Sequence, residues 1–174
     1  MGSTKAIALG QIQSVTRLGV AADCATQHTV NLFTVAGTVI LVSIVGRVVA
    51  AKAVGAQTLR LGHVPTDSGV EAFLCAASAT TASDAIDELY FITGVIGDQM
   101  IVNPASGIGL SNLMVNEAGL VGAPQGLLLA PGIMRMTTAA ANDLTGLINW
   151  TARYIRIAAV GGGVPASTDG MTVL

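Results

Sequence analysis

The stretch 28-HTVNLFTVAGTVILVSIVGRVVAA-51 dominates the fold of this chain. It is rich in Val, Ile and Thr, and β-branched side chains fit a pleated strand but lose rotamer freedom in a helix. Its single charge is Arg47, and two glycines interrupt the apolar run. The pattern predicts two strands, residues 28–36 and 38–51, that meet at Gly37.

The second of these strands is apolar on both faces. Strict alternation places one set of side chains on the first face and a second set on the other: Ile40, Val42, Ile44 and Val48 against Val39, Leu41, Ser43, Val45, Arg47 and Val49. A strand with two apolar faces is normally covered on both sides. We therefore expect a second sheet or another subunit to pack against each face.

A membrane-spanning helix is the alternative for the same region. Residues 29–46 hold 18 positions without a charge, which is near the lower limit for such a helix. Asn31, four Thr or Ser residues and two glycines interrupt the run, and no basic cluster flanks it to set an orientation. Buried strands are the preferred interpretation, and we expect no membrane partner.

The composition indicates that this chain does not function as an isolated monomer. Of 174 residues, 52% are hydrophobic and 10% are charged, whereas globular domains carry about 25% charged residues. The eight basic and ten acidic residues make 18 charged side chains. A monomer of this size exposes about 8,000 Å², or about 440 Å² for each charge, which is comparable to the largest apolar patch of a typical monomer. We expect an obligate oligomer or a component of a larger assembly.

The charge pattern excludes nucleic acid as an expected partner. The formal net charge is −2, and the basic residues are scattered along the sequence. A nucleic-acid site needs a basic patch that neutralises phosphates. Only Arg153 and Arg156 lie close together, and one pair does not make such a patch.

The chain divides into three predicted parts. Residues 1–27 are expected to form an extended arm that becomes ordered against a neighbour, with a frayed terminus as the alternative. A signal peptide is not expected here, since Gln11 and Gln13 interrupt the apolar core that it requires. Residues 28–160 are expected to form one β-sandwich domain. A run of three glycines then leads into a C-terminal tail, residues 161–174.

Further short strands are predicted along the domain. They lie at residues 57–64, 70–77, 90–95, 99–102 and 145–158, with a hairpin of residues 126–130 and 132–138 around Pro131, and one short strand at residues 113–115 within a long loop. Ser83 is expected to cap a single helical turn. Many short strands, frequent turn signals and no long amphipathic helix predict an all-β sandwich, a jelly roll or a related Greek-key fold.

Two cysteines and two histidines are the candidates for a metal site. Cys24 and His28 have a possible ligand spacing, and His63 with Cys75 would complete four ligands. No CxxC or HxxxH pattern supports this set, so we expect no metal and no cofactor. Two reduced, buried thiols are favoured in the absence of an export signal, and a disulfide between Cys24 and Cys75 is the alternative.

The acidic residues Asp84, Asp87 and Glu88, together with Asp98, are candidates for a calcium site. They lack the spacing of a calcium-binding loop, so a solvated acidic turn is the preferred interpretation. Asp87 and Glu88 adjoin in sequence, whereas a glycosidase needs two carboxylates that face each other across a sugar. No nucleophile-elbow sequence is present. We expect no catalytic residues and no enzyme activity.

Two short motifs have ordinary structural explanations. Gly107-Ile108-Gly109 follows no strand-to-helix phosphate signature, so these are expected to be turn glycines. Asn149-Trp150-Thr151 matches a glycosylation acceptor but lies within a predicted strand.

Five segments resemble a group of small tailed-bacteriophage virion proteins, which are all-β chains rich in Ala, Gly, Val and Thr. The segments are residues 32–37 (LFTVAG), 59–61 (LRL), 74–77 (LCAA), 90–94 (YFITG) and 150–154 (WTARY). The likeness covers roughly residues 29–157.

The resemblance implies a virion structural role, that of a capsid decoration or cement protein. It implies a homotrimer bound to a major capsid protein on the capsid surface of the virion, made in the host cytoplasm. A phage fibre, spike or receptor-binding module is the alternative. The family supplies no catalytic residues.

Overall fold

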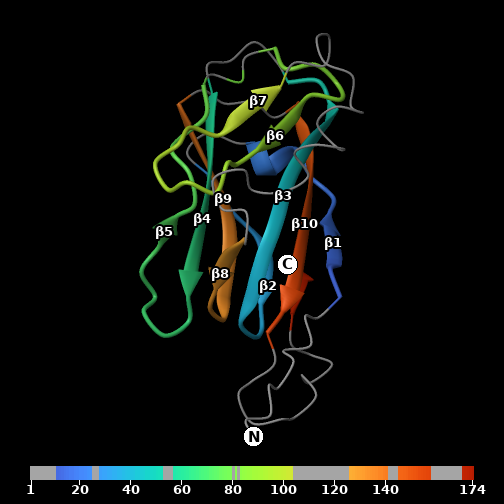
Figure 1. Cartoon of the computed structure of the whole chain (residues 1–174). Coiled ribbons are helices and arrows are strands. Elements are labelled where there is room, and N and C mark those ends of the chain that lie inside the picture. Colours follow the sequence, from blue (N-terminus) through green and yellow to red (C-terminus); the bar gives the residue numbers. More distant parts are fainter. Residues whose placement is uncertain are drawn as a thin grey trace, which may run out of the picture.

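The computed structural model describes residues 11–24, 28–52, 57–79, 81, 83–103, 126–140, 145–157 and 170–174. Within these ranges the chain forms two antiparallel sheets that pack face to face (Figure 1). The one helical element of the described residues is a 3₁₀ turn, η1 (Ala21–Cys24). The prediction of an all-β sandwich is confirmed.

Each sheet contains strands from both halves of the chain. Sheet A has the order β1 (Gln13–Arg17), β10 (Leu147–Arg156), β3 (Val39–Ala50), β6 (Leu89–Phe91) and β7 (Ile101–Asn103), and β8 (Leu127–Leu129) also pairs with β3. Sheet B has the order β11 (Met171–Val173), β2 (Thr29–Val35), β9 (Gly132–Ala140), β4 (Gln57–Pro65) and β5 (Ala72–Phe73). The two strands predicted from the opening stretch, now β2 and β3, lie in opposite sheets.

The strand pairing is nested, as it is in a jelly roll. The first strand pairs with β10, β2 pairs with β9, β3 pairs with β6 and β8, and β4 pairs with β5. Such an order arises when one long antiparallel hairpin is rolled into two sheets. The pairing therefore places this chain in the jelly-roll class that the sequence predicted.

The strands β6 and β8 share one position beside β3. Both run antiparallel to it, with Phe91 opposite Val45 and Leu127 opposite Leu41. Together, β6 and β8 occupy the place of the sixth strand of the jelly roll. Residues 92–126 are inserted between them in the sequence.

A bulge in β3 corrects the prediction of strict alternation. Leu41 and Ile44 were placed on opposite faces by alternation, yet both are buried in the core. The register shifts between Arg153 and Tyr154 of β10, which lie opposite Ser43 and Leu41. The extra residue, Val42, reverses the phase of the strand, because a bulge opposes two residues to one.

The predicted hairpin around Pro131 is wrong. The strand β8 pairs with β3 in sheet A, whereas β9 pairs with β2 and β4 in sheet B. The chain therefore crosses from one sheet to the other at this point. Gly132 is needed at the crossing, because a Cβ there would lie 2.2 Å from the carbonyl oxygen of Val64.

Two smaller predictions also differ from the structure. Only Ala72–Phe73 of the predicted strand 70–77 pairs as a strand. No helical turn follows Ser83, since Ser83 and Asp87 both adopt positive φ angles, 63° and 76°. The predicted strand at residues 113–115 lies outside the described residues.

The described parts of the predicted arm and tail belong to the sandwich. Strand β1 pairs with β10 along five residues, and Cys24 at the end of η1 is fully buried. At the other terminus, β11 pairs with β2. The predicted boundaries at residues 28 and 160 therefore divide a single folded unit, while residues 1–10, 25–27 and 158–169 lie outside the described part.

Replacement of Gly132 by alanine tests the sheet crossing. The added methyl group would meet the Val64 carbonyl and the His63 ring, so the variant should lose about 1–3 kcal/mol of unfolding free energy, as overpacked sites do. Urea denaturation of Gly132→Ala measures the loss. Ala139→Ser, at an exposed position of the same strand, should change stability by less than about 0.5 kcal/mol. Equal effects in the two variants would contradict the tight crossing.

Candidate assembly surface

The four candidate metal ligands do not form a site in the described residues. His28 is exposed at the start of β2, whereas Cys24 and Cys75 are buried free thiols. His63 is buried on β4, and its Nε2 has no hydrogen-bond partner in the part of the chain that is described. No group of three His, Cys, Asp or Glu side chains within the described ranges is arranged to hold a metal ion.

Burial controls the titration of the groups that lie in the core. It raises the pKa of the Cys75 thiol, although a hydrogen bond from the Leu61 backbone N–H, at 3.4 Å, opposes the shift. Burial also raises the pKa of Tyr90 far above its ordinary value, and its hydrogen bond to Asp84 adds to the effect. Both groups therefore stay protonated at neutral pH.

The predicted acidic turn is engaged in internal contacts. Asp84 is buried and accepts a hydrogen bond from the Tyr90 hydroxyl. Asp87 pairs with Arg47 at 2.5 Å, and Asp98 accepts a hydrogen bond from Thr93 at 2.8 Å. Asp84, Asp87 and Asp98 thus have protein partners, and Asp84 is buried, whereas the sequence predicted a solvated turn.

Asn149 lies within strand β10, where its side chain accepts a hydrogen bond from the Gly19 backbone N–H at 2.9 Å. Its neighbour Trp150 is buried in the core. The glycosylation motif is therefore part of the folded sheet, and the Gly107–Gly109 motif lies outside the described residues.

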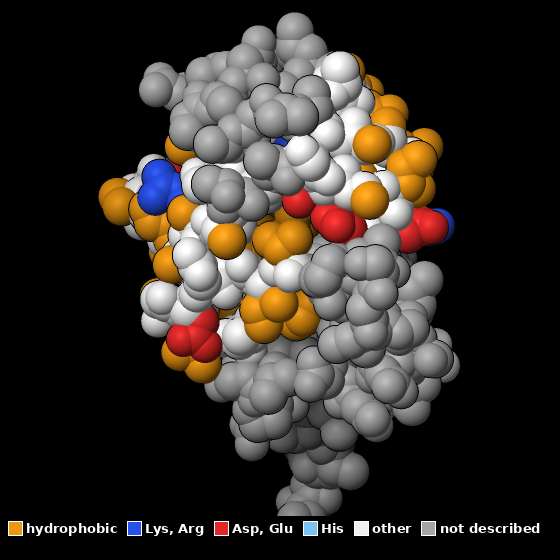
Figure 2. Space-filling view, turned by 90° about the horizontal axis from the view of Figure 1, so that it is seen from above, with side chains coloured by type: hydrophobic (Ala, Val, Ile, Leu, Met, Phe, Trp, Pro, Cys, Tyr) orange, Lys and Arg blue, Asp and Glu red, His pale blue; other side chains and the backbone are white. Residues whose placement is uncertain are grey.

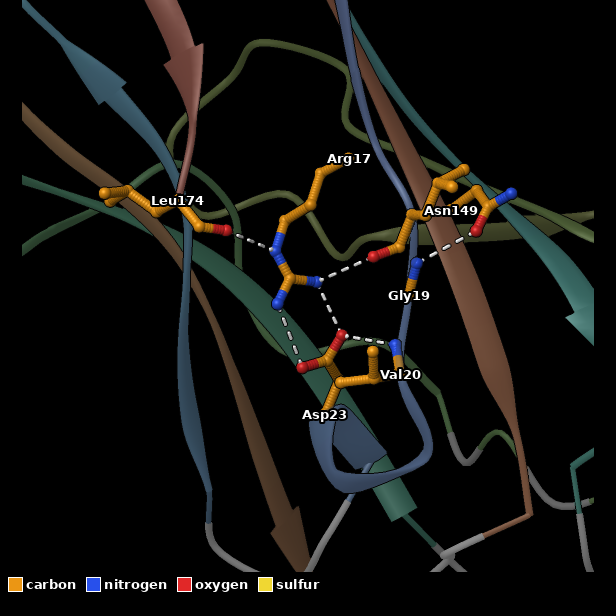
Figure 3. Close-up of polar contacts among 7 residues, drawn as sticks. Arg17, Gly19, Val20, Asp23, Asn149 and Leu174 are labelled. Carbon is orange, nitrogen blue, oxygen red and sulfur yellow. Dashed lines mark hydrogen bonds and ion pairs between the residues drawn. The ribbon is translucent and has the colours of Figure 1, made fainter.

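A polar clamp closes one open side of the sandwich, where the edge strands β1 and β11 lie near each other (Figure 3). The guanidinium of Arg17 pairs with Asp23 at 2.5 Å and 3.1 Å and donates to the carbonyl oxygen of Leu174 at 3.3 Å. Asp23 also accepts from the Val20 backbone N–H at 3.0 Å. The clamp ties both described ends of the chain to the sandwich itself.

The outer face of sheet A points away from sheet B. Two rows of side chains that cross this face are largely apolar, a lower row near the start of β3 and a middle row halfway along it. Because residues directly opposite each other in antiparallel strands share a face, the pairing defines these rows. The lower row joins Ile155, Ile40 and Leu128. The middle row joins Thr16, Thr151, Val45, Phe91 and Ile101.

These apolar side chains reach solvent. Leu128 is 69% exposed, and Ile101 and Ile157 are also exposed, while Ile40, Val45 and Ile155 are partly exposed. We call this surface, made up of Ile40, Val42, Val45, Phe91, Ile101, Leu128, Ile155 and Ile157, the sheet A outer face. The second apolar face of β3, predicted to be covered, is thus left accessible in the single chain.

The outer face of sheet B has a different character. One of its rows joins Thr29, Thr137 and Arg60, and the next joins Asn31 and Arg135. Arg135 pairs with Glu71 at 2.7 Å, and the Arg60 guanidinium stacks 3.6 Å above the Phe73 ring. The polar and charged groups therefore make the outer face of sheet B suitable for contact with water.

The loops beside β6 add further apolar exposure at one end of the sandwich. Ile86, Val95 and Ile96 are all exposed. Figure 2 looks down on the end that lies at the top of Figure 1 and shows several groups of hydrophobic side chains among few charged ones.

No helix of the described residues is long and apolar enough to cross a membrane.

The sequence pattern indicated an apolar β3 but could not define this surface. The rows depend on which strands are neighbours and on the bulge at Val42. The predicted hairpin pairs Leu128 with β9, so it does not predict the place of Leu128 beside Ile40. The run of three leucines at residues 127–129, without a charge, was the available signal.

No protein-family model matches the chain, and no curated protein is similar to it. Among solved structures, a chain in the structure of infectious bursal disease virus Gx strain is similar at a TM-score of 0.37 with 11% sequence identity. The match covers 98% of this chain and 39% of that chain, so the present chain spans about two fifths of its length. A likeness at this level assigns neither a fold nor a function.

The stability of the protein should fall in mild acid because of His63. Burial lowers the pKa of its ring, and the Ala130 backbone opposes this only in part. Its contribution is therefore full above the unfolded pKa of about 6.5 and is lost as the pH falls below that value, since the unfolded chain then binds the proton more readily. Thermal melts between about pH 7.5 and 5.5 should show a smaller drop for His63→Gln than for the wild type. Parallel curves for the two proteins would contradict the assignment.

The clamp should contribute measurably to stability. Arg17→Met leaves the nearly buried Asp23 carboxylate without its cation, which should cost about 3 kcal/mol. In the double variant Arg17→Met/Asp23→Asn the uncompensated charge is gone, and the Asn oxygen can still accept from Val20. Denaturant unfolding should therefore show a smaller loss for the double variant than for Arg17→Met alone. A larger loss would mean that the ion pair is not the source of the effect.

Proposed function

We propose that this chain is a non-enzymatic structural protein of a bacteriophage virion. It decorates and cements the capsid shell by binding copies of itself and the major capsid protein. The observation that carries the proposal is the sheet A outer face, an accessible apolar surface on a jelly roll with few charges. Large exposed apolar patches mark interaction sites.

The resemblance noted from the sequence supports the same role. Of the five segments that carry it, residues 32–37, 59–61, 90–94 and 150–154 contribute to strands β2, β4, β6 and β10, and residues 74–77 follow β5. These segments hold much of the core, including Phe33, Leu61, Tyr90 and Trp150. The likeness therefore concerns the framework of the protein, as expected of a structural component.

Cementing follows from the thermodynamics of linked binding. A decoration protein that contacts several shell subunits binds the assembled shell and not the free subunits. Its binding free energy is then added to the stability of the shell. Contacts that are weak one by one become strong together when they are made from one oligomer, because each further contact is intramolecular. A homotrimer on the outer surface of the capsid provides this multivalency.

The internal pairing of charges also suits this role. Arg17, Arg47 and Arg135 each pair with a carboxylate of their own chain. These ion pairs hold loops and edges in place. The groups of a catalytic site instead converge on one point. On sheet A, the surface that is left for partners is mainly apolar.

The copy number of the protein in the particle tests the proposal. A cement protein occupies many equivalent sites, so densitometry of purified particles should give a ratio near one to one with the major capsid protein. A fibre, spike or tail-tip protein is limited by vertex or tail symmetry to far fewer copies. A small fraction of the major capsid protein would reject cementing in favour of these alternatives.

A further inference from the structure

We infer that the sheet A outer face is the surface through which copies of this chain bind one another. The inference deepens the proposed function, on whose self-assembly step it rests, by assigning that step to named residues. The occupant of the face is a second copy of the chain. Three properties of the face support this assignment: its size, its low charge and the uncharged strand at its edge.

The face has the size that one partner contributes to a stable interface. Strand β3 is 12 residues long, which corresponds to about 40 Å at 3.3 Å per residue. Five strand positions about 4.8 Å apart give a width of about 20 Å. Because the other strands are shorter than β3, the 36 residues of the six strands, at about 16 Å² each, give an area of about 570 Å². Two copies would then bury about 1,100 Å² together, which exceeds the area of about 1,000 Å² expected of a specific interface.

The charges of the face favour a copy of itself over a charged partner. Arg47, at its upper border, is paired with Asp87 of the same chain. Thr16 and Thr151 share a hydrogen bond at 2.9 Å, so these hydroxyls are also partnered internally. Only Arg153, between the two apolar rows, is a charge for which no ion pair is seen among the described residues. A surface that is apolar apart from one charge can pack against its own copy when that charge stays at the solvated rim, whereas a strongly charged surface repels its own copy.

Among the described residues, the edge strand β8 extends the face and carries no charge. Natural edge strands are guarded by charges, by proline or by their short length. Strand β1 is polar and ends in Arg17, and β5 has two residues and follows Glu71. Strand β8 is short, but its three residues are all leucine, and Leu128 points outward from it. A neighbouring copy that covers the Ile155–Ile40–Leu128 row would shield this edge as well.

Charge substitutions on the two outer faces provide the test. Ile40→Asp and Leu128→Glu each place a charge in the sheet A outer face. Ile133→Asp is the matched control for Ile40→Asp, because Ile133 is also a half-exposed isoleucine on the outer face of a central strand, β9 of sheet B. Val173→Glu is the control for Leu128→Glu, as an exposed residue of the edge strand β11. Circular dichroism of all four variants verifies that each is folded before association is measured.

Sedimentation velocity of the full chain across a dilution series measures the self-association of each variant. The wild type, Ile133→Asp and Val173→Glu should sediment as oligomers at micromolar concentration. Leu128→Glu and Ile40→Asp should weaken association about tenfold or more, since each would bury an unpaired charge between copies. Should Ile40→Asp fail to fold, Leu128→Glu alone decides, because that side chain is exposed in the single chain.

Three outcomes would overturn the inference. They are a monomeric wild type, sheet A variants that associate as tightly as the wild type, and controls that dissociate as much as the sheet A variants. The failure of the proposed function looks different. If the sheet A variants dissociate but the particle holds only a few copies, the self-association face stands and the cementing role falls.

Discussion

The packing of Trp150 against the bare backbone of Gly46 underlies the interior of this protein. Trp150 lies on β10 directly opposite Gly46 on β3, and a Cβ at Gly46 would come within 2.9 Å of the indole ring. On the other side of Gly46 lies Tyr90, whose ring centroid is 6.4 Å from that of Trp150. One glycine thus makes room for two of the six aromatic side chains, and flexible residues such as Met134 and Met136 fill the core opposite.

Charge is used sparingly and locally in this molecule. The Arg17–Asp23 pair closes the side where β1 and β11 lie, and the Arg135–Glu71 pair covers Gly62 on sheet B. Because each pair joins segments far apart or fixes a loop, the few charges stabilise the periphery while the sheets depend on apolar burial. The consequence is a sharp difference between the two outer faces, with polar groups on sheet B and aliphatic groups on sheet A.

That difference connects the fold with the proposed role. A jelly roll holds its core between two sheets, so its outer faces are free to differ without cost to the interior. In this chain β3 is apolar on both faces, which contributes to the core on one side and to the candidate interface on the other. Self-association and shell binding would then use the same physical force that folds the chain.

The class of fold and the strands β2, β3, β4 and β10 could be predicted from the sequence, and the shortage of charge led to the expectation of a partner surface. The reason is that β-branched composition and a shortage of charge are properties of the chain itself, independent of what it pairs with. The sheet crossing at Gly132, the two short strands that share one position beside β3, and the burial of both Leu41 and Ile44 could not be predicted. Each depends on which distant segment lies opposite. A one-residue bulge reverses the face of every side chain that follows it, and local sequence carries no record of that partner.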